Sequence, residues 1–210
     1  MEKELYILRH GETEYNRLKI VQGSGVDTSL NETGRAQAKA FYERYQDIPF
    51  ELVITSALKR SQQTVEAFGK KGIPTAHFSE INEINWGIHE GKKSLPEMIA
   101  QYQALMEDWK NGHYEAHLEE GESAAELAQR LKRFLELLKS RPEQRILICT
   151  HGRTLRCLMC LIKGDPLSKM NEIPHQNTGL YVVYLEQETF RVVTENDAQH
   201  LESLHSAKND

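Results

Sequence analysis

Two His-Gly pairs, each placed directly after a short apolar run, are the strongest chemical signal in the sequence. His10-Gly11, preceded by Arg9, follows the run at residues 5–8, and His151-Gly152 follows the run at 145–150. In an open α/β sheet, ligands bind outside the carboxyl ends of the strands. One imidazole there could attack phosphorus, while a second, protonated imidazole holds the charge of the phosphoryl oxygens. Either pair alone would be an ordinary polar strand end, but together they predict a site for a phosphorylated ligand.

A candidate cation lies near the start of a predicted helix. Residues 52–55 form another short apolar run, and the helical pattern at 57–70 that follows carries Arg60 close to its beginning. A guanidinium beside the N–H groups of a helix start can bind phosphate through two parallel hydrogen bonds. Arg60 alone would be interpreted as a solvated helix residue, so its weight comes from the two His-Gly pairs.

The elements that must position these residues alternate along the chain. Runs rich in branched and aromatic residues predict strands at 5–8, 52–55, 145–150, 180–185 and 190–194, and helical patterns occupy 32–45, 57–70, 95–110, 123–138 and 154–162. This alternation indicates an α/β fold with a mainly parallel sheet. We expect a three-layer α/β/α sandwich in which one edge strand could be antiparallel. The nearly continuous apolar runs at 5–8 and 145–150 suit central strands that are covered on both faces.

Two helix starts and one insertion complete the predicted domain. Asn31 is a good N-cap, and Ser123 with Glu126 three residues later forms a capping box. Residues 88–121 contain one helical pattern and no convincing strand, so we expect a helical insertion over the active site. The length and the lack of a visible linker favour a single domain over residues 1–210.

Composition limits the classes of partner. The formal net charge is −5, so the chain as a whole has no electrostatic attraction for nucleic acid or for an anionic membrane. Three cysteines, an odd number, argue against a disulfide framework and favour a reducing, cytoplasmic location. The first apolar run is too short for a signal peptide or a membrane span. His113 and His117 have a helical spacing, but without an HExxH motif or a zinc-type cysteine pair we expect no metal site.

Several short motifs follow one another in a fixed order. They are Arg9-His10-Gly11-Glu12-Thr13 with Asn16, then Gln22-Gly23, the stretch 56–64, the stretch 83–91, Gly121-Glu122-Ser123 and Thr150-His151-Gly152. In this order they resemble the histidine phosphatase superfamily, also called the phosphoglycerate mutase-like family. One departure is His89, which stands where the third motif of the family usually has an aromatic residue. We therefore expect the rim of the pocket to differ from the usual one.

The resemblance implies that His10 is the nucleophile and becomes transiently phosphorylated. It further implies a set of residues that hold the phosphate or the rest of the substrate: Arg9, Arg60, His151, Asn16, Gln22, Gly23 and the backbone N–H of Gly152. No metal or other cofactor is implied, because fixed arginines and a helix start would take the place of a magnesium ion.

Glu83 matches the proton donor of the family, and it would also contact the substrate. A carboxyl group beside a cationic pocket can protonate a leaving alkoxide and can later activate water. Glu80 and Glu90 are nearby competitors for this role, and a solvated loop carboxylate is the alternative interpretation of Glu83.

The expected function is therefore hydrolysis of a small phosphorylated metabolite. A bisphosphoglycerate-dependent phosphoglycerate mutase is one alternative, although the chain lacks the pair of adjacent arginines that such enzymes carry after the third motif. A catalytically silent module that binds a phosphorylated ligand is another. A strand edge near the C-terminus or at the second strand could pair with a second copy, so a homodimer stays open.

Overall fold

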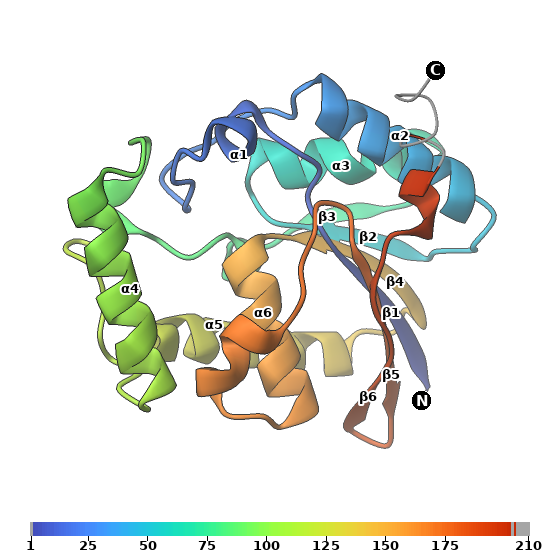
Figure 1. Ribbon diagram of the computed structural model, residues 1–210. Helices are drawn as coiled ribbons and strands as arrows, with labels where there is room; N and C mark the ends of the chain where they lie inside the picture. The colour runs from blue at the N-terminus through green and yellow to red at the C-terminus, as the bar shows by residue number, and fades with distance from the viewer. Residues whose placement is uncertain (1, 203, 205–210) are drawn as a thin grey trace.

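A six-stranded sheet forms the centre of the protein, as the computed structural model shows for residues 2–202 and 204 (Figure 1). The strands are β1 (Lys3–Arg9), β2 (Leu52–Thr55), β3 (Thr75–His77), β4 (Arg145–Thr150), β5 (Leu180–Glu186) and β6 (Thr189–Asp197), in the spatial order β3-β2-β4-β1-β5-β6. The pairs β1–β4, β2–β4 and β2–β3 are parallel, whereas β5 pairs antiparallel with β1 and with β6. The mainly parallel sheet is thus confirmed, with antiparallel pairing confined to one side.

Helices cover both faces of this sheet, which confirms the three-layer sandwich. The α-helices are α1 (Glu14–Leu18), α2 (Glu32–Tyr45), α3 (Lys59–Lys70), α4 (Pro96–Lys110), α5 (Ala124–Ser140) and α6 (Gly152–Lys163). Short 3-10 helices lie at η1 (Ser79–Ile81), η2 (Gly87–His89), η3 (Leu167–Glu172) and η4 (Gln199–Leu201). In Figure 1, α2 and α3 lie on one face of the sheet and α5 and α6 on the other.

The central strands bury side chains on both faces. Leu8 and Leu147 pack in the cluster on the side of α2 and α3, and Ile7 and Ile148 pack in the cluster on the side of α5 and α6. A strand covered on both faces needs apolar residues at every position, since successive side chains point to opposite faces. This is the physical reason for the nearly continuous apolar runs in β1 and β4.

The strand register brings the candidate residues to one edge. Arg9 at the end of β1 is paired with Thr150 at the end of β4, and Thr55 at the end of β2 is paired with Cys149. The residues that follow these strands, including His10 and His151, therefore leave the sheet at the same level.

Helix starts follow the local sequence closely. The side chain of Asn31 accepts a hydrogen bond from the N–H of Gly34 at 2.8 Å, and Ser123 with Glu126 forms both bonds of a capping box at the start of α5. α6 begins at Gly152, two residues earlier than the pattern at 154–162 predicts, because His151 is its extended N-cap residue. The backbone N–H groups of the first turn are thereby aimed at the carboxyl edge of the sheet.

Two short elements were absent from the sequence prediction. β3 is a three-residue strand with mostly exposed side chains, and it is held through its pairing with β2. α1 is a five-residue helix that is stabilised by a capping box between Thr13 and Asn16. Elements this short give no periodic signal, which is why the sequence did not reveal them.

The segment 88–121 contains α4 and carries one isolated bridge, between Lys93 and Ile20, among its described residues. Leu105 and Trp109 on α4 are buried in the core, and the indole N–H of Trp109 donates to the carbonyl of Ala116 at 2.9 Å. α4 stands apart from the sheet, to the left in Figure 1. Within the described residues, every helix is too short or too polar to cross a lipid bilayer.

Candidate active site

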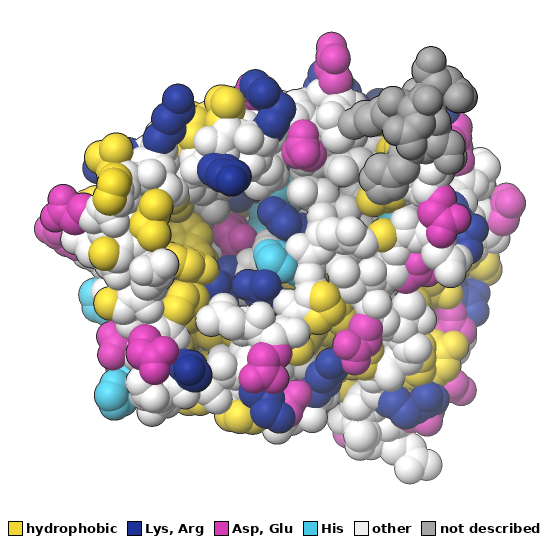
Figure 2. Space-filling view, in the orientation of Figure 1, with side chains coloured by type: hydrophobic (Ala, Val, Ile, Leu, Met, Phe, Trp, Pro, Cys, Tyr) yellow, Lys and Arg dark blue, Asp and Glu magenta, His cyan; other side chains and the backbone are white. Residues whose placement is uncertain are grey.

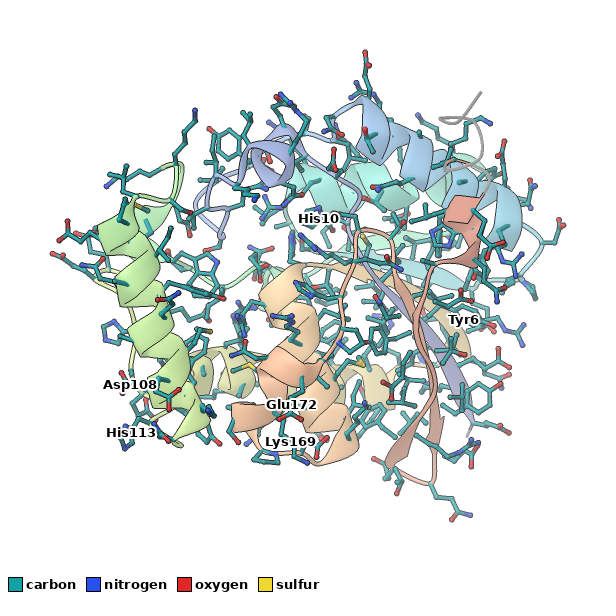
Figure 3. The ribbon with its side chains drawn as sticks, viewed as in Figure 1. Tyr6, His10, Asp108, His113, Lys169 and Glu172 are labelled. Carbon is teal, nitrogen blue, oxygen red and sulfur yellow. The ribbon has the colours of Figure 1, made fainter. Side chains whose placement is uncertain are left out.

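Two histidines from different strand ends lie next to each other at the carboxyl edge of the sheet. The ring centroids of His10 and His151 are 5.1 Å apart, and both side chains are buried. Figure 3 shows His10 between the layer of α2 and α3 and the start of α6. The sequence pattern placed both residues at strand ends, and the parallel register of β1 and β4 brings them together.

His10 is held in one orientation and one tautomer. Its Nδ1 lies 2.7 Å from the carbonyl oxygen of Gly11, and a carbonyl can only accept, so Nδ1 carries the proton. No hydrogen bond from Nε2 is found within the described residues, which leaves the Nε2 lone pair free. Burial, followed by the nearby charges of Arg60 and Arg9, lowers the pKa of His10 well below its ordinary value. The ring is therefore neutral at physiological pH, with the lone pair of Nε2 available for a reaction.

Gly11 lets the loop after β1 pass close to two helices. Its N–H donates to Thr64 Oγ1 of α3 at 2.9 Å. A Cβ at position 11 would lie 2.7 Å from the carbonyl oxygen of Gly34 in α2, too close for any real side chain. Glycine is required here by this backbone contact, and the contact fixes the residue that follows His10.

Arg60 is completely buried behind His151. Its Nε donates to His151 Nδ1 at 3.2 Å, while Nη1 and Nη2 donate to the carbonyls of Val26 at 2.6 Å and Gly23 at 3.1 Å. The guanidinium thus ties the loop around residue 23 to the second histidine. Arg60 thus donates hydrogen bonds to other groups of the protein as well as offering its charge to a ligand, which the sequence did not indicate.

The protonation of His151 differs from the expected one. Because Arg60 can only donate, Nδ1 of His151 accepts, and Nε2–H donates to Ser56 Oγ at 2.7 Å. Burial, together with the charges of Arg60 and other neighbouring groups, lowers the pKa of His151 well below its ordinary value. The expectation of a protonated second imidazole is therefore corrected: the ring is neutral in this arrangement, because a buried cation already lies against it.

Arg9 and the start of α6 provide donors for an anion. The Nη1 of Arg9 donates to the carbonyl of His175 at 3.3 Å, and its Nε is buried with no hydrogen-bond partner in the described structure. A Cβ built on Gly152 would lie 3.5 Å from that Nε, so the guanidinium is close to the first residue of α6. The described contacts give the N–H of Gly152 no acceptor either. An unpaired guanidinium N–H beside a helix N-terminus is a favourable binding site for phosphate.

Glu83 is fixed against the same helix start. Its Oε2 accepts from the N–H of Arg153 at 3.0 Å, and its Oε1 accepts from the N–H groups of Thr154 and Ile84, both at 3.0 Å. The side chain is only 7% exposed, so the alternative of a solvated loop carboxylate is excluded. These bonds hold the Glu83 carboxylate in the first turn of α6, because its donors Arg153 and Thr154 come two and three residues after His151.

The two competing carboxyl groups have other positions. Oε1 of Glu90 accepts from the N–H of Trp86 at 2.9 Å, and a Cβ at Gly23 would come within 1.8 Å of the same oxygen. Glu90 is thus packed under the loop that Arg60 holds, and burial raises its pKa. Glu80 lies on η1, where its carbonyl accepts a hydrogen bond from Arg130. Glu83 is the one of the three that is bonded to the helix start after His151.

The predicted contacts at residues 16, 22 and 23 form one hydrogen-bonded loop. Asn16 Oδ1 accepts from the backbone N–H of Thr13 at 3.1 Å, and Gln22 Nε2 donates to Thr13 Oγ1 at 2.7 Å. Gly23 contributes its carbonyl to Arg60. For Asn16 the amide nitrogen makes no hydrogen bond in the described residues, so that nitrogen is the atom available to a ligand.

Further residues at the site were not identified from the sequence. Asn177 Nδ2 donates to the carbonyl of His10 at 2.8 Å, and the ring of His175 packs against Gly152. Burial, and then Arg9, Arg156 and Arg153, lower the pKa of His175 to about 3. Both side chains come from a loop without regular structure, and no motif marks it. Arg153 and Arg156 could have been recognised as site residues from the sequence, because they lie one and four residues after Gly152 on α6.

A largely apolar pocket of about 280 Å³ lies between this edge and α4. It is lined by Val21, Gln22, Trp86, His89, Ser94, Met98, Ile99, Tyr102 and Leu118. His89 is buried and its Nε2 contacts Gln101 Oε1 at 2.7 Å, so the departure noted at this motif does contribute to the pocket wall. Figure 2 shows a hollow on this face with hydrophobic side chains over α4 on one side and basic side chains and histidine at its floor.

The residues considered for metal binding lie elsewhere. His113 faces Asp108 near the end of α4, far from His10 in Figure 3, and His117 Nδ1 contacts the carbonyl of Leu118 at 2.9 Å. Across residues 2–202 and 204, no group of three His, Cys, Asp or Glu side chains is arranged to hold a metal ion. The cysteines at 149, 157 and 160 are buried free thiols.

Comparison with known proteins gives the same assignment for the fold. A protein of Hydrogenobacter thermophilus with the provisional name phosphoserine phosphatase 2 is 28% identical, with 96% of this chain and 99% of that protein aligned. A probable phosphoglycerate mutase of Erwinia tasmaniensis is 31% identical over 95% of each chain. The crystal structure of the α-ribazole phosphatase from Shigella flexneri matches with a TM-score of 0.81 and 25% identity, over 93% of this chain and 96% of that one. The model of the histidine phosphatase superfamily (branch 1) matches residues 5–198, and the chain belongs to that family.

Proposed function

We propose that the protein is a phosphomonoesterase that hydrolyses a small phosphorylated metabolite through a phosphohistidine on His10. The observation that carries this proposal is the state of His10, a neutral imidazole whose Nδ1–H is bound to Gly11 and whose Nε2 is free. The unpaired Nε of Arg9 lies near Gly152 at the same strand end. A fixed nucleophile beside unpaired anion donors is the arrangement that phosphoryl transfer requires.

In the first step, Nε2 of His10 attacks phosphorus while the bond from phosphorus to the ester oxygen breaks. Arg9, the Gly152 N–H and the amide nitrogen of Asn16 hold the phosphoryl oxygens, with Arg60 and His151 behind them. An approaching phosphate dianion raises the pKa of His151, because an opposite charge favours the protonated ring. Glu83 takes up a proton as the substrate binds and transfers it to the departing alkoxide.

In the second step, water attacks the phosphohistidine and the bond between nitrogen and phosphorus breaks. Glu83 is now a carboxylate and takes one proton from that water. Inorganic phosphate leaves, and His10 and Glu83 return to their starting protonation states. One water is consumed for each ester cleaved, and the product alcohol carries the proton that Glu83 supplied.

Transfer to water and transfer to a second hydroxyl differ in the acceptor alone. Support for hydrolysis comes from relatives named as phosphatases and from the absence of the adjacent arginine pair after the third motif. The mutase function remains the second candidate because a relative of 31% identity bears that name. A silent binding module has less support, since the nucleophile and its cationic partners are all in place.

The experiment compares phosphate release by the wild-type protein, the variant His10→Ala and the control variant His113→Ala. His10→Ala should lose activity by about 10³-fold or more, and should no longer give an acid-labile phosphoenzyme. His113 is an exposed histidine at the far end of α4, so its replacement should leave the rate unchanged. Unchanged hydrolysis in His10→Ala would refute the nucleophile. Isomerisation of phosphoglycerate much faster than phosphate release would replace the phosphatase with the mutase.

A further inference from the structure

Four arginines surround the candidate active site without a carboxylate partner. Arg9, Arg60, Arg153 and Arg156 take part in none of the ion pairs within 4 Å that the described residues form. The acid that acts electrostatically on Arg9, Arg60 and Arg156 alike is Glu83, whose oxygens are already bound by N–H groups at the start of α6. Unpaired charges of one sign are costly in a partly buried site unless an anionic ligand compensates them.

Arg153 and Arg156 have different access to a ligand. Arg153 is buried: Nη1 donates to Asn171 Oδ1 at 2.8 Å, Nη2 donates to Tyr102 Oη at 2.6 Å, and the guanidinium lies over the rings of Trp86 and Trp109. Arg153 therefore contributes a fixed positive charge to the site, and its guanidinium makes no direct contact with a ligand.

Arg156 is only partly buried and keeps a free end. Its Nε donates to the carbonyl of Ile173 at 2.9 Å, which fixes the direction of the guanidinium. No hydrogen bond from Nη1 or Nη2 is found within the described structure. Burial, and then the charge of Arg153, lower the pKa of Arg156 to about 10, so the group remains charged at neutral pH. Two parallel N–H donors with no acceptor match the two oxygens of a carboxylate.

The position of Arg156 relates it to the phosphate site. Arg156 is four residues after Gly152, so both lie on the same face of α6, one turn apart. Long helical side chains lean toward the helix N-terminus, which directs Arg156 back toward Gly152. In agreement with this, the charges of Arg9 and Arg156 both lower the pKa of His175, whose ring packs on Gly152.

We propose that Arg156 forms a second anion subsite, one helical turn from the phosphate site, which binds a carboxylate on the leaving group of the substrate. The substrate class is therefore a phosphorylated carboxylic acid in which the carboxylate lies a few bonds from the ester oxygen. This proposal rests on the proposed phosphomonoesterase function and narrows it. The apolar pocket beside Tyr102 would accept the remainder of a larger substrate.

The test uses two pairs of substrates that differ by one carboxylate. Phosphoserine is compared with phosphoethanolamine, and 3-phosphoglycerate with glycerol 3-phosphate, by kcat/KM for phosphate release. The wild-type protein should prefer the acid of each pair by about 10- to 100-fold, the worth of a charged hydrogen-bonded contact. In Arg156→Gln this preference should fall to near one, mainly through KM, and Arg156→Lys should restore part of it.

The ratio within each pair removes effects that are common to both substrates, including any loss of folded protein. Arg133, an exposed arginine on α5, provides the matched control, and Arg133→Gln should keep the wild-type preference. Equal rates for both members in the wild-type protein, or an unchanged preference in Arg156→Gln, would overturn the subsite and leave the phosphatase proposal standing. A gain from the second phosphate of 2,3-bisphosphoglycerate, with no gain from a carboxylate, would overturn the carboxylate assignment. Failure to release phosphate from any ester, p-nitrophenyl phosphate included, would instead refute the phosphatase function.

Discussion

Replacing Glu83 by Gln separates the two proton transfers that the proposed mechanism assigns to one side chain. With a leaving alkoxide the variant should lose about 10²- to 10⁴-fold in kcat, because no group can protonate the ester oxygen. p-Nitrophenyl phosphate has a leaving group that is stable as an anion, so its first step needs no proton. The second step still lacks its base. The variant should therefore release a burst of p-nitrophenol equal to the enzyme concentration, followed by slow turnover.

The same substitution has a structural cost that follows from the contacts of Glu83. If the amide oxygen takes the place of Oε1, it keeps the bonds from Ile84 and Thr154. The amide NH₂ then faces the N–H of Arg153, where Oε2 accepted a bond of 3.0 Å. Two donors facing each other cost about 1–3 kcal/mol, and loss of negative charge at the start of α6 costs about 0.3–1 kcal/mol more. A total of about 1.3–4 kcal/mol corresponds to a fall in Tm of about 3–16 °C for a chain of this size.

The assays are stopped-flow release of p-nitrophenol, steady-state hydrolysis of an alkyl phosphate that the wild-type protein cleaves, and thermal unfolding. Glu126→Gln is the matched control, because Glu126 also accepts a backbone N–H bond at a helix start, from Ser123, but belongs to α5. That variant should retain wild-type kinetics. Hydrolysis of the alkyl phosphate by Glu83→Gln within about threefold of the wild-type rate would refute the assignment of Glu83 as acid. Absence of the burst, with a slow first step, would refute its assignment as base in the second step only.

Two further predictions concern stability. Gly11→Ala should lower the free energy of unfolding by about 1–3 kcal/mol in urea titration, because its Cβ would lie 2.7 Å from the carbonyl of Gly34; Gly69→Ala, on α3, should stay within about 1 kcal/mol of wild type, and equal behaviour of the two variants would contradict the contact. His200 has its pKa lowered from 6.5 to about 4 by burial, so the unfolded chain takes up its proton first on acidification. The contribution of His200 to the free energy of unfolding is therefore complete above about pH 6.5. It falls as the pH drops, by about 3 kcal/mol at pH 4. In denaturant titrations between pH 4 and pH 7, His200→Gln should reduce the change of the free energy of unfolding with pH. Parallel curves of this free energy against pH for variant and wild type would show that His200 is not the group responsible.

Local sequence was sufficient for the large elements and for the two histidines that the structure places side by side at the carboxyl edge of the sheet. β1 and β4 could be predicted because a strand covered on both faces must be apolar at nearly every position, and the polar residue that ends such a strand is then conspicuous. His10 and His151 were found in this way. The starts of α2 and α5 could be predicted because Asn31 and Ser123 cap their helices through bonds that span three residues. Arg60 was found from its place at a predicted helix start, and the match to the ordered family motifs added Glu83. The sequence could not show the surroundings of either residue.

Tertiary structure alone decided the protonation states and the remainder of the site. The expected cationic His151 is neutral because the guanidinium of Arg60, 91 residues away in the chain, donates to its Nδ1. The loop with His175 and Asn177 joins the site because β5 is placed beside β1 in the sheet. Sequence by itself determined which side chains stand at the ends of strands, since that depends on neighbours along the chain. Where their protons lie, and which remote arginines accompany them, depends on packing between distant segments, and no local pattern contains that information.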